Sequence, residues 1–405
     1  MGGARRRAAG LAAVAGLVLL AACTGGRIDS GGPGGSVPPT TAPERPPEAF
    51  YAVPDPLPPG PPGALIRAVP IAGLSVLPDS RAWAILYHSR DFDGRDVAVS
   101  GVVIAPPGAA PSGGRPVVVW GHGSVGLADR CAPSRVGVME ALGGGPLGSL
   151  LQQGVVVAAT DYQGLGTPGP ARSAIGLSAG RAVLDAARAA RGLDVGAGGR
   201  VVLHGHSEGG HAVLWAAELA RSYASELQVV GVAASAPGAE LAAGLRVEAA
   251  AGPAALTSGA MLLVVAWSDV YRVPLDVLTP AGRKAVGRVR STCLQELMAD
   301  PQVVAVRPRD LLTTPPWPAL LARNTPGKAA TPAPILLAQG ADDDRVTPAV
   351  TRALVERLCR LGDTVELRTY QGVGHFDVLE VASTDMVAWT GERLAGRPAR
   401  STCRR

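Results

Sequence analysis

The stretch that decides the fold runs from Val201 to Trp215 and reads VVLHGHSEGGHAVLW. Its first residues are apolar and mostly β-branched, as in a buried strand, and an apolar, Ala-rich pattern typical of a helix follows the glycines. Between them lies Gly205-x-Ser207-x-Gly209, in which small residues let the backbone turn sharply and hold a serine hydroxyl clear of the strand. A strand, a sharp turn and a helix around a serine predict a nucleophile at Ser207.

The pattern alone is weak evidence, because 53 of the 405 residues are glycine. Residues 176–180 contain it as well, around Ser178. Ser178, however, follows no apolar strand and lies inside a helix-like stretch, 172–191. We therefore interpret Ser178 as a helix-packing residue and keep Ser207 as the candidate nucleophile.

The composition is typical of a globular enzyme, with 47% hydrophobic and 18% charged residues. The net charge is +5, and the basic residues are almost all arginines scattered singly, without a basic stripe and interleaved aromatics. Nucleic-acid binding is therefore not expected. A chain of 405 residues predicts one large domain with an insertion, or two domains.

The first 23 residues resemble an export signal. Three arginines at positions 5–7 precede an apolar run, Ala8 to Ala22, which is shorter than the roughly 20 residues of a membrane span. The run ends in the sequence LAAC, which resembles the lipobox of bacterial lipoproteins. We predict that Cys23 is lipidated and that the exported protein is anchored on the outer face of the bacterial cell membrane, with ordinary secretion as the alternative.

Residues 24–63 are first Gly-rich and then Pro-rich. Such a composition can bury little apolar surface. We therefore predict an extended tether here.

The rest of the chain alternates short apolar strands with helices, which predicts an α/β fold with a mostly parallel central sheet covered on both faces. Residues 239–334 lack this alternation. We interpret them as a largely helical cap inserted into a main domain of residues 64–238 and 335–405. The apolar patches of the cap are consistent with packing against the main domain and equally with the lining of an acyl pocket. The expected strands lie at 82–89, 96–105, 116–120, 155–160, 201–205, 229–236, 335–339 and 365–370, and the expected helices at 173–191, 347–361 and 378–394.

A serine nucleophile needs a base, and the base needs a third group to orient it. In this fold the chain order is serine, acid, histidine, and His375 is the only histidine after His211. We therefore predict His375 as the base. His211 lies one helical turn from the serine, in a packing position, and we interpret His204 and His206 as structural.

Three consecutive aspartates compete for the role of the acid. Asp343 is our choice, because the acid commonly falls three residues after the glycine that ends the strand, here Gly340. We interpret Asp342 and Asp344 as turn or ion-pairing residues. Asp269, in the cap, is a weaker alternative acid.

Attack on an ester creates an oxyanion that needs preorganised N–H donors. The backbone N–H of Glu208, directly after the serine, is one candidate donor. Gly123 and Ser124 are the other candidates, because residues 121–124 read Gly-His-Gly-Ser, similar to the His-Gly oxyanion loops of esterases. Alternatively, these residues form only a tight turn.

Five segments together resemble the secretory lipase, or lipase-A-type, family of α/β-hydrolases: GHGSVGLADRCAPS (121–134), ATDYQGLGTPG (159–169), GHSEGGHA (205–212), QGADDDRVTP (339–348) and GHFD (374–377). The resemblance covers the chain from about residue 50 to its end. It implies a carboxylic-ester hydrolase with Ser207, Asp343 and His375 as its triad, but it leaves the acyl-chain length open. Glu208 stands where glutamine is frequent in the relatives, and we expect its carboxylate to alter the local electrostatics.

Besides Cys23, four cysteines are present, and an exported protein tends to pair them. Three pairings are possible. The resemblance implies one pair that ties the oxyanion-side loop to the cap and one that ties the tail to the last helical layer; these are Cys131 with Cys293 and Cys359 with Cys403. The sequence has no CxxC or HxxxH pair of the kind that binds zinc, and no cofactor is implied.

The sequence thus predicts an exported serine ester hydrolase, a lipase or esterase, that acts on acyl esters such as lipids through an acyl-enzyme. Two alternatives stay open. An acyltransferase would use the same triad, and a non-catalytic cell-surface binding protein would use only the scaffold. No feature of the sequence indicates the oligomeric state.

Overall fold

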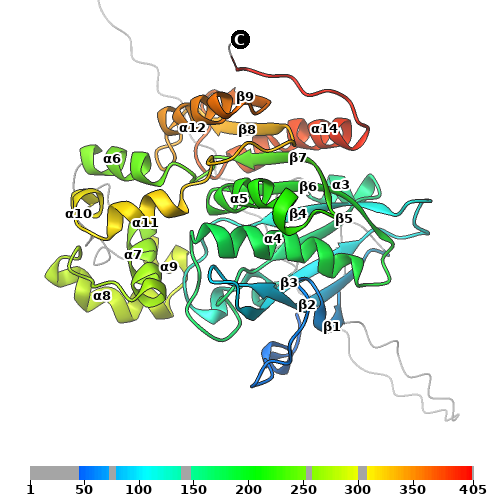
Figure 1. Cartoon of the computed structure of the whole chain (residues 1–405), viewed down its shortest axis with the longest axis horizontal. Helices are drawn as coiled ribbons and strands as arrows, with labels where there is room; N and C mark the ends of the chain where they lie inside the picture. Colours follow the sequence, from blue (N-terminus) through cyan, green and yellow to red (C-terminus); the bar gives the residue numbers. More distant parts are fainter. Residues whose placement is uncertain (1–44, 73–78, 138–146, 252–257, 300–307, 404–405) are drawn as a thin grey trace, which may run out of the picture. The chain divides into compact units, whose positions relative to one another are not determined.

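The computed structural model describes residues 45–403 with the exception of 73–78, 138–146, 252–257 and 300–307. The predicted signal and the predicted lipidation site, Cys23, lie outside the described residues. In the described chain, a nine-stranded sheet has the order β1-β2-β3-β5-β4-β6-β7-β8-β9 (Figure 1). The strands are β1 (Leu65–Ile71), β2 (Arg81–Arg90), β3 (Asp96–Ala105), β4 (Arg115–Gly121), β5 (Val156–Thr160), β6 (Ala197–His206), β7 (Gln228–Ser235), β8 (Ile335–Gly340) and β9 (Val365–Tyr370).

The strand pairing divides the sheet into two parts. The β1, β2, β3 and β5 pairs are antiparallel, and every pair from β5 through β4 to β9 is parallel. All residues of β5 and β8 are buried, because helices cover both faces of a parallel sheet. The α/β class and the mostly parallel sheet predicted from the sequence are therefore confirmed.

Helices on the two faces bury separate apolar clusters. One cluster joins the sheet to α4 (Gly176–Arg191), α5 (Glu208–Tyr223) and α12 (Pro348–Leu361). The other joins the opposite face to α3 (Leu147–Gln152), α13 (Val378–Val381) and α14 (Ser383–Leu394). Successive residues of a strand point to opposite faces, so that Val117 and Val119 of β4 belong to the first cluster and Val118 to the second.

Most of the described residues in the segment 239–334 lie in helices, which are joined by loops. Its helices share an apolar core of their own that includes Trp267 and Trp317, stacked with ring centroids 6.4 Å apart. Figure 1 shows these helices grouped together at one end of the sheet. They are α6 (Leu241–Ala251), α7 (Ser258–Tyr271), α8 (Pro280–Ser291), α9 (Leu294–Met298), α10 (Pro308–Thr313) and α11 (Trp317–Asn324).

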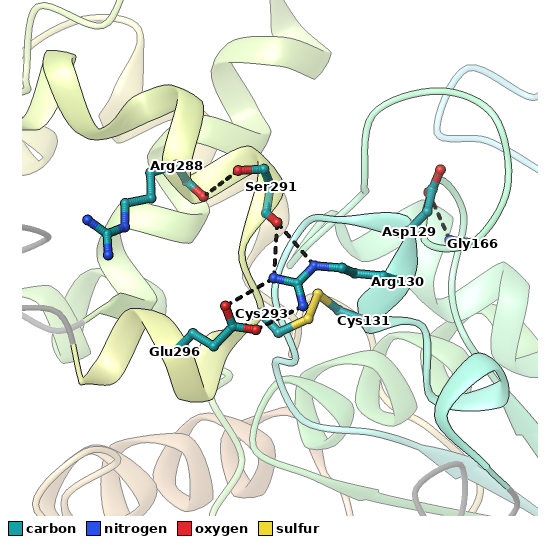
Figure 2. Close-up of a disulfide and its surroundings, with 8 residues drawn as sticks. All are labelled: Asp129, Arg130, Cys131, Gly166, Arg288, Ser291, Cys293 and Glu296. Atoms are coloured by element: carbon teal, nitrogen blue, oxygen red, sulfur yellow. Dashed lines mark hydrogen bonds and ion pairs between the residues drawn. A yellow bond between two sulfur atoms is a disulfide. The ribbon is translucent and has the colours of Figure 1, made fainter.

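A disulfide ties the cap to the loop that follows β4. Cys131, in the short 3-10 helix η2 (Asp129–Cys131), pairs with Cys293 at the start of α9 (Figure 2). Beside it, the Leu294 N–H donates to the Val125 carbonyl at 2.8 Å. A second disulfide, Cys359 to Cys403, ties α12 to the C-terminal tail. These two pairs are the ones that the family resemblance implies.

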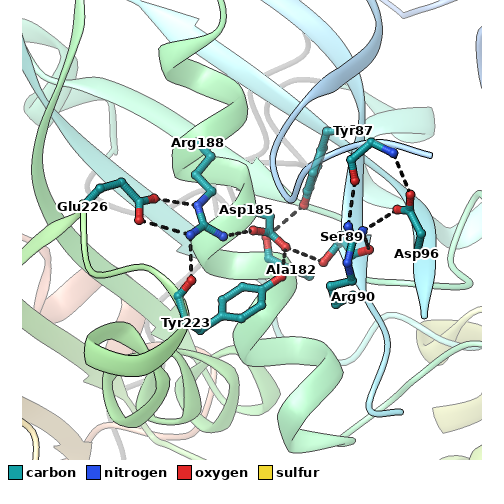
Figure 3. A network of polar contacts seen from close by, with 10 residues as sticks. Tyr87, Ser89, Arg90, Asp96, Ala182, Asp185, Arg188, Tyr223 and Glu226 are labelled. Atoms are coloured by element: carbon teal, nitrogen blue, oxygen red, sulfur yellow. Dashed lines mark hydrogen bonds and ion pairs between the residues drawn. The ribbon is translucent and has the colours of Figure 1, made fainter. Parts of the chain in front are cut away.

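A buried polar network connects β2 with α4 and α5 (Figure 3). The fully buried carboxylate of Asp185 accepts hydrogen bonds from Ser89 at 2.7 Å, from Tyr223 at 2.8 Å and from Arg188 at 2.8 Å. Burial raises the pKa of Asp185, although these partners favour its charged form. The network stabilises the packing of α4 and α5, which cover one face of the sheet that contains β6.

Two expectations about the N-terminal part of the described chain are wrong. Residues 45–63 do not lie free as a tether, because Phe50 and Tyr51 of the 3-10 helix η1 (Glu48–Tyr51) are only 2% and 5% exposed. The Arg135 guanidinium lies 3.7 Å from the Tyr51 ring centroid. In addition, the sheet begins with β1, ahead of 82–89, the first strand expected from the sequence.

Candidate active site

The turn between β6 and α5 holds Ser207 with φ 54° and ψ −115°. A residue with a side chain rarely adopts a positive φ, and such backbone persists only where the surroundings impose it. Here the surroundings are glycines in close contact. A Cβ on Gly209 would lie 1.9 Å from the carbonyl oxygen of Gly121, and one on Gly205 would lie 2.2 Å from the carbonyl oxygen of Gly209. The helix can therefore approach the sheet only with glycine at these positions.

His375 lies between Ser207 and Asp343. Its Nε2 is 3.0 Å from Ser207 Oγ, and its Nδ1 is 2.8 Å from Asp343 Oδ2. Asp343 follows β8 and His375 follows β9, so that both come from the carboxyl edge of the parallel strands. The structure thus brings the three predicted residues together in one line of hydrogen bonds.

The carboxylate of Asp343 is held by several donors besides His375. Its Oδ1 accepts the backbone N–H groups of Val346 at 2.8 Å and Arg345 at 2.9 Å. Burial by itself would raise the pKa of Asp343, but the hydrogen bond and charge of His375 and these two N–H groups together lower it. Asp343 is therefore ionised at neutral pH, as a group that orients a histidine must be.

The competing acids lie elsewhere. Asp342 and Asp344 are exposed to solvent. Asp269, on α7, pairs with Arg290 of α8 at 2.9 Å. None of the three has a hydrogen bond to His375 in the described part of the chain.

The other histidines of the nucleophile region have partners of their own. His204 Nε2 lies 2.7 Å from the Thr390 hydroxyl of α14, and His206 Nδ1 lies 3.1 Å from a serine hydroxyl of β7. Burial lowers the pKa of His204 to about 4 and, with the charge of His375, lowers the pKa of His206 to about 3. His211 Nε2 lies 2.6 Å from a backbone carbonyl of α11. These contacts agree with the structural roles expected for all three.

The loop after β4 passes directly beside the nucleophile. A Cβ added to Gly123 would lie 3.5 Å from the Ser207 Cβ. Glu208 is the first residue of α5, where backbone N–H groups have no partner within the helix. The predicted oxyanion donors, Gly123, Ser124 and Glu208, thus gather around Ser207.

The side chain of Glu208 makes contacts that sequence reasoning missed. Its Oε2 accepts the Ser124 hydroxyl at 2.6 Å, and its Oε1 accepts the Ala174 backbone N–H at 2.8 Å. The carboxylate therefore bridges the loop after β4 and the loop before α4. The only sequence signal for this bridge was the presence of a glutamate after the nucleophile, where glutamine is frequent in the relatives. The sequence does not indicate which residues the glutamate contacts.

Two cavities of about 160 Å³ each meet at Ser207 among the described residues. The first lies against Leu294 and Met298 of α9 and against Phe376, which is 52% exposed. The second lies under the cap helices α6 and α7, where Leu245 and Leu263 line it. Apolar side chains of the cap thus serve both in its own core and in the walls of the site.

The part of the chain that the structure describes contains no group of three or more His, Cys, Asp or Glu side chains able to hold a metal ion. None of its helices combines the length and apolarity needed to cross a membrane.

A family model for secretory lipases matches residues 146–402. A secreted triacylglycerol lipase of Malassezia globosa is 28% identical over 272 residues, which are 64% of this chain and 57% of that relative, so the chain spans little more than half its length. A Mycobacterium tuberculosis protein named a probable inactive lipase is 24% identical, over 83% of this chain and 79% of its own. The X-ray structure of Candida antarctica lipase A shares the fold, with a TM-score of 0.72 at 21% identity over 88% of this chain and 87% of that one. The predicted resemblance is therefore confirmed, and this chain belongs to the secretory lipase family.

Proposed function

We propose that the protein is an exported serine hydrolase that cleaves carboxylic esters, of the lipase or esterase type. One observation carries this proposal: the His375 imidazole is hydrogen-bonded to Ser207 on one side and to Asp343 on the other. That is the arrangement by which a base activates a serine hydroxyl. Membership of the secretory lipase family supports the same class of reaction.

In the proposed reaction, Ser207 Oγ attacks the acyl carbon while His375 Nε2 takes its proton. Asp343 holds the imidazole through Nδ1 and stabilises the positive charge that forms there. His375 then gives the proton to the leaving alcohol as the acyl-enzyme forms. A water molecule, activated by the same histidine, attacks the acyl-enzyme and releases the acid.

The negative oxygen of each tetrahedral intermediate is stabilised by backbone N–H groups. The proposed donors are those of Glu208, which directly follows Ser207, and of Gly123 and Ser124, in the loop that passes beside Ser207. Removing one such donor typically costs roughly 100-fold to 1,000-fold in rate, so these groups supply a large part of the catalysis.

We propose esters of short acyl chains as the preferred substrates. An acyl chain held in one of the two cavities at Ser207 must be short, because each cavity is about 160 Å³, below the roughly 300–1,000 Å³ of most ligand pockets. The Malassezia relative is named a triacylglycerol lipase, so that triacylglycerols are the alternative substrates. The acyl-length profile decides between the two.

The test compares the form that starts after residue 23 with Ser207→Ala, on nitrophenyl esters from acetyl to palmitoyl. We expect hydrolysis to peak at short chains and kcat to fall by roughly a million-fold in the variant. A serine-reactive phosphonate should label the wild type and not the variant. If the folded wild type neither hydrolyses any ester nor takes up the phosphonate, a non-catalytic binding protein replaces the proposal, an outcome for which the probable inactive lipase is a precedent in name.

Acyl transfer is the second candidate, because the same acyl-enzyme can react with an alcohol instead of water. Adding methanol to the assay separates the two reactions. With a low concentration of methanol, a hydrolase releases mainly free acid, whereas an acyltransferase forms methyl ester as the main product.

We also propose that the protein is exported and held at the membrane by a lipid on Cys23. The export signal predicted in residues 1–23 and the secreted relatives support export. Cys23→Ser, expressed with its signal in a bacterial host, should move the protein from the membrane fraction to the soluble fraction and abolish incorporation of labelled palmitate. Unchanged fractionation and labelling would refute the lipid anchor and leave export standing.

A further inference from the structure

Ser124 lines the cavities at the nucleophile, where the oxyanion of the proposed reaction forms. Its neighbour Gly123 lies directly against the nucleophile. Serine hydroxyls serve as oxyanion donors in addition to backbone N–H groups. A hydroxyl has a single proton to donate, however. In this structure that proton is directed to Glu208 Oε2, at 2.6 Å.

We propose that Glu208 is a positioning residue that withholds the Ser124 hydroxyl from the oxyanion. The inference rests on the proposed function, since it concerns the oxyanion of that reaction. An ionised carboxylate can only accept hydrogen bonds, so it always competes for the serine proton. Hydrogen bonds to a charged acceptor are also stronger than those to a neutral one. The oxyanion hole therefore uses only its backbone donors, and the Ser124 hydroxyl does not donate to the oxyanion.

The second contact of Glu208 makes this inference testable with one substitution. Its Oε1 accepts the Ala174 N–H at 2.8 Å, which only an acceptor can do. In Glu208→Gln the amide oxygen must therefore face Ala174, and the amide NH₂ must face Ser124. The Ser124 oxygen then accepts a hydrogen bond and its proton is free for the oxyanion. The shape and the bridge between the two loops are preserved.

The experiment is a double-mutant cycle on the best nitrophenyl ester, with wild type, Glu208→Gln, Ser124→Ala and the double variant. We expect Glu208→Gln to raise kcat by about 10-fold to 100-fold, because it adds a donor used only in the transition state. KM should change by less than about twofold, since a merely structural change would not separate the two constants in this way. In the Ser124→Ala background the same substitution should give no gain.

Two results would overturn the inference. A gain in kcat that persists undiminished in the Ser124→Ala background would assign the effect to the field of the carboxylate and not to the hydroxyl. An unchanged or lower kcat in Glu208→Gln, with a melting temperature like that of the wild type, would show that the hydroxyl is not withheld.

If Glu208→Gln fails to fold, Glu208→Ala replaces it, because removal of the acceptor also frees the hydroxyl and predicts a gain of the same sign. The Ser207→Ala comparison separates this inference from the proposed function. A wild type without Ser207-dependent hydrolysis contradicts the function itself, whereas an active wild type with no gain contradicts only the role of Glu208.

Discussion

Asp343 is only 3% exposed and accepts hydrogen bonds from His375 and from two backbone N–H groups, whereas Asp342 and Asp344 on either side face solvent. The sequence predicts Asp343 as the acid from its spacing to Gly340 and from the order of acid and histidine, which are local or topological rules, and the structure places Asp343 beside His375. The bridge made by Glu208 could not be predicted. It depends on how two loops distant in sequence approach each other, and no pattern within either loop encodes that distance.

The three aspartates provide a matched test of the acid. Asp343→Asn should lower kcat on the order of 10,000-fold, because an amide cannot stabilise the imidazolium and favours the wrong tautomer of His375. Asp342→Asn and Asp344→Asn are the controls, and we expect kcat within about twofold of the wild type for these solvent-exposed sites. The measurement is ester hydrolysis by all three variants. A large loss in either control, with Asp343→Asn active, would move the acid to a neighbouring residue.

Among the elements, the edge strand β1 and the cap helix α9 could not be predicted from local sequence patterns. The stretch Leu65–Ile71 contains Pro70, which argues against a strand interior, yet an edge strand tolerates proline. Residues 45–63 likewise have a tether-like composition, and only the fold provides the surface that buries Phe50 and Tyr51. Helix α9 is a short element that the sequence did not distinguish within the cap. Its position depends on a covalent tie to the loop beside the nucleophile.

The two disulfides allow the contribution of that tie to be measured. In the chain-entropy model, loops of 162 and 44 residues stabilise the fold by about 5 and about 4 kcal/mol. Replacing either pair with alanines should therefore lower the free energy of unfolding by similar amounts. Only Cys131→Ala/Cys293→Ala should also lower kcat/KM, because α9 supplies Leu294 and Met298 to a cavity at the nucleophile.

Urea unfolding and ester hydrolysis, both at a temperature well below the melting of either variant, are the measurements. The Cys359→Ala/Cys403→Ala variant is the control for loss of stability alone. Equal losses of kcat/KM in the two variants would show that the tie to α9 has no specific effect on the site.

For the whole molecule, the mostly parallel sheet could be predicted because each strand is a short apolar run that ends at a turn sequence. The cap could be predicted only as a helical region, since its helices bury one another as well as the site and their arrangement follows from long-range contacts. The same burial places neutral histidines in the interior. The pKa of His204 is lowered by burial from 6.5 to about 4.

This burial predicts a loss of stability in acid. Between about pH 6.5 and 4 the unfolded chain binds a proton at His204 and the folded chain does not, so the free energy of unfolding falls as the pH falls. His204→Gln keeps a hydrogen-bonding group near Thr390 and removes the titration. As the pH falls over this range, the free energy of unfolding of the variant should fall less steeply than that of the wild type. The difference in slope should correspond to the uptake of about one proton on unfolding. Urea unfolding at several pH values measures the slope, and identical slopes for variant and wild type would contradict the prediction.

The link between Cys131 and Cys293 also has a consequence for the order of biosynthesis. The ribosome makes Cys131 long before its partner, which follows 162 residues later, so the bond closes only after most of the cap has been synthesised. It also needs an oxidising compartment, which the cytosol is not. Chains that are still in the cytosol therefore lack the covalent link between the cap and the loop after β4, and completion of the site depends on transfer to an oxidising compartment as well as on folding.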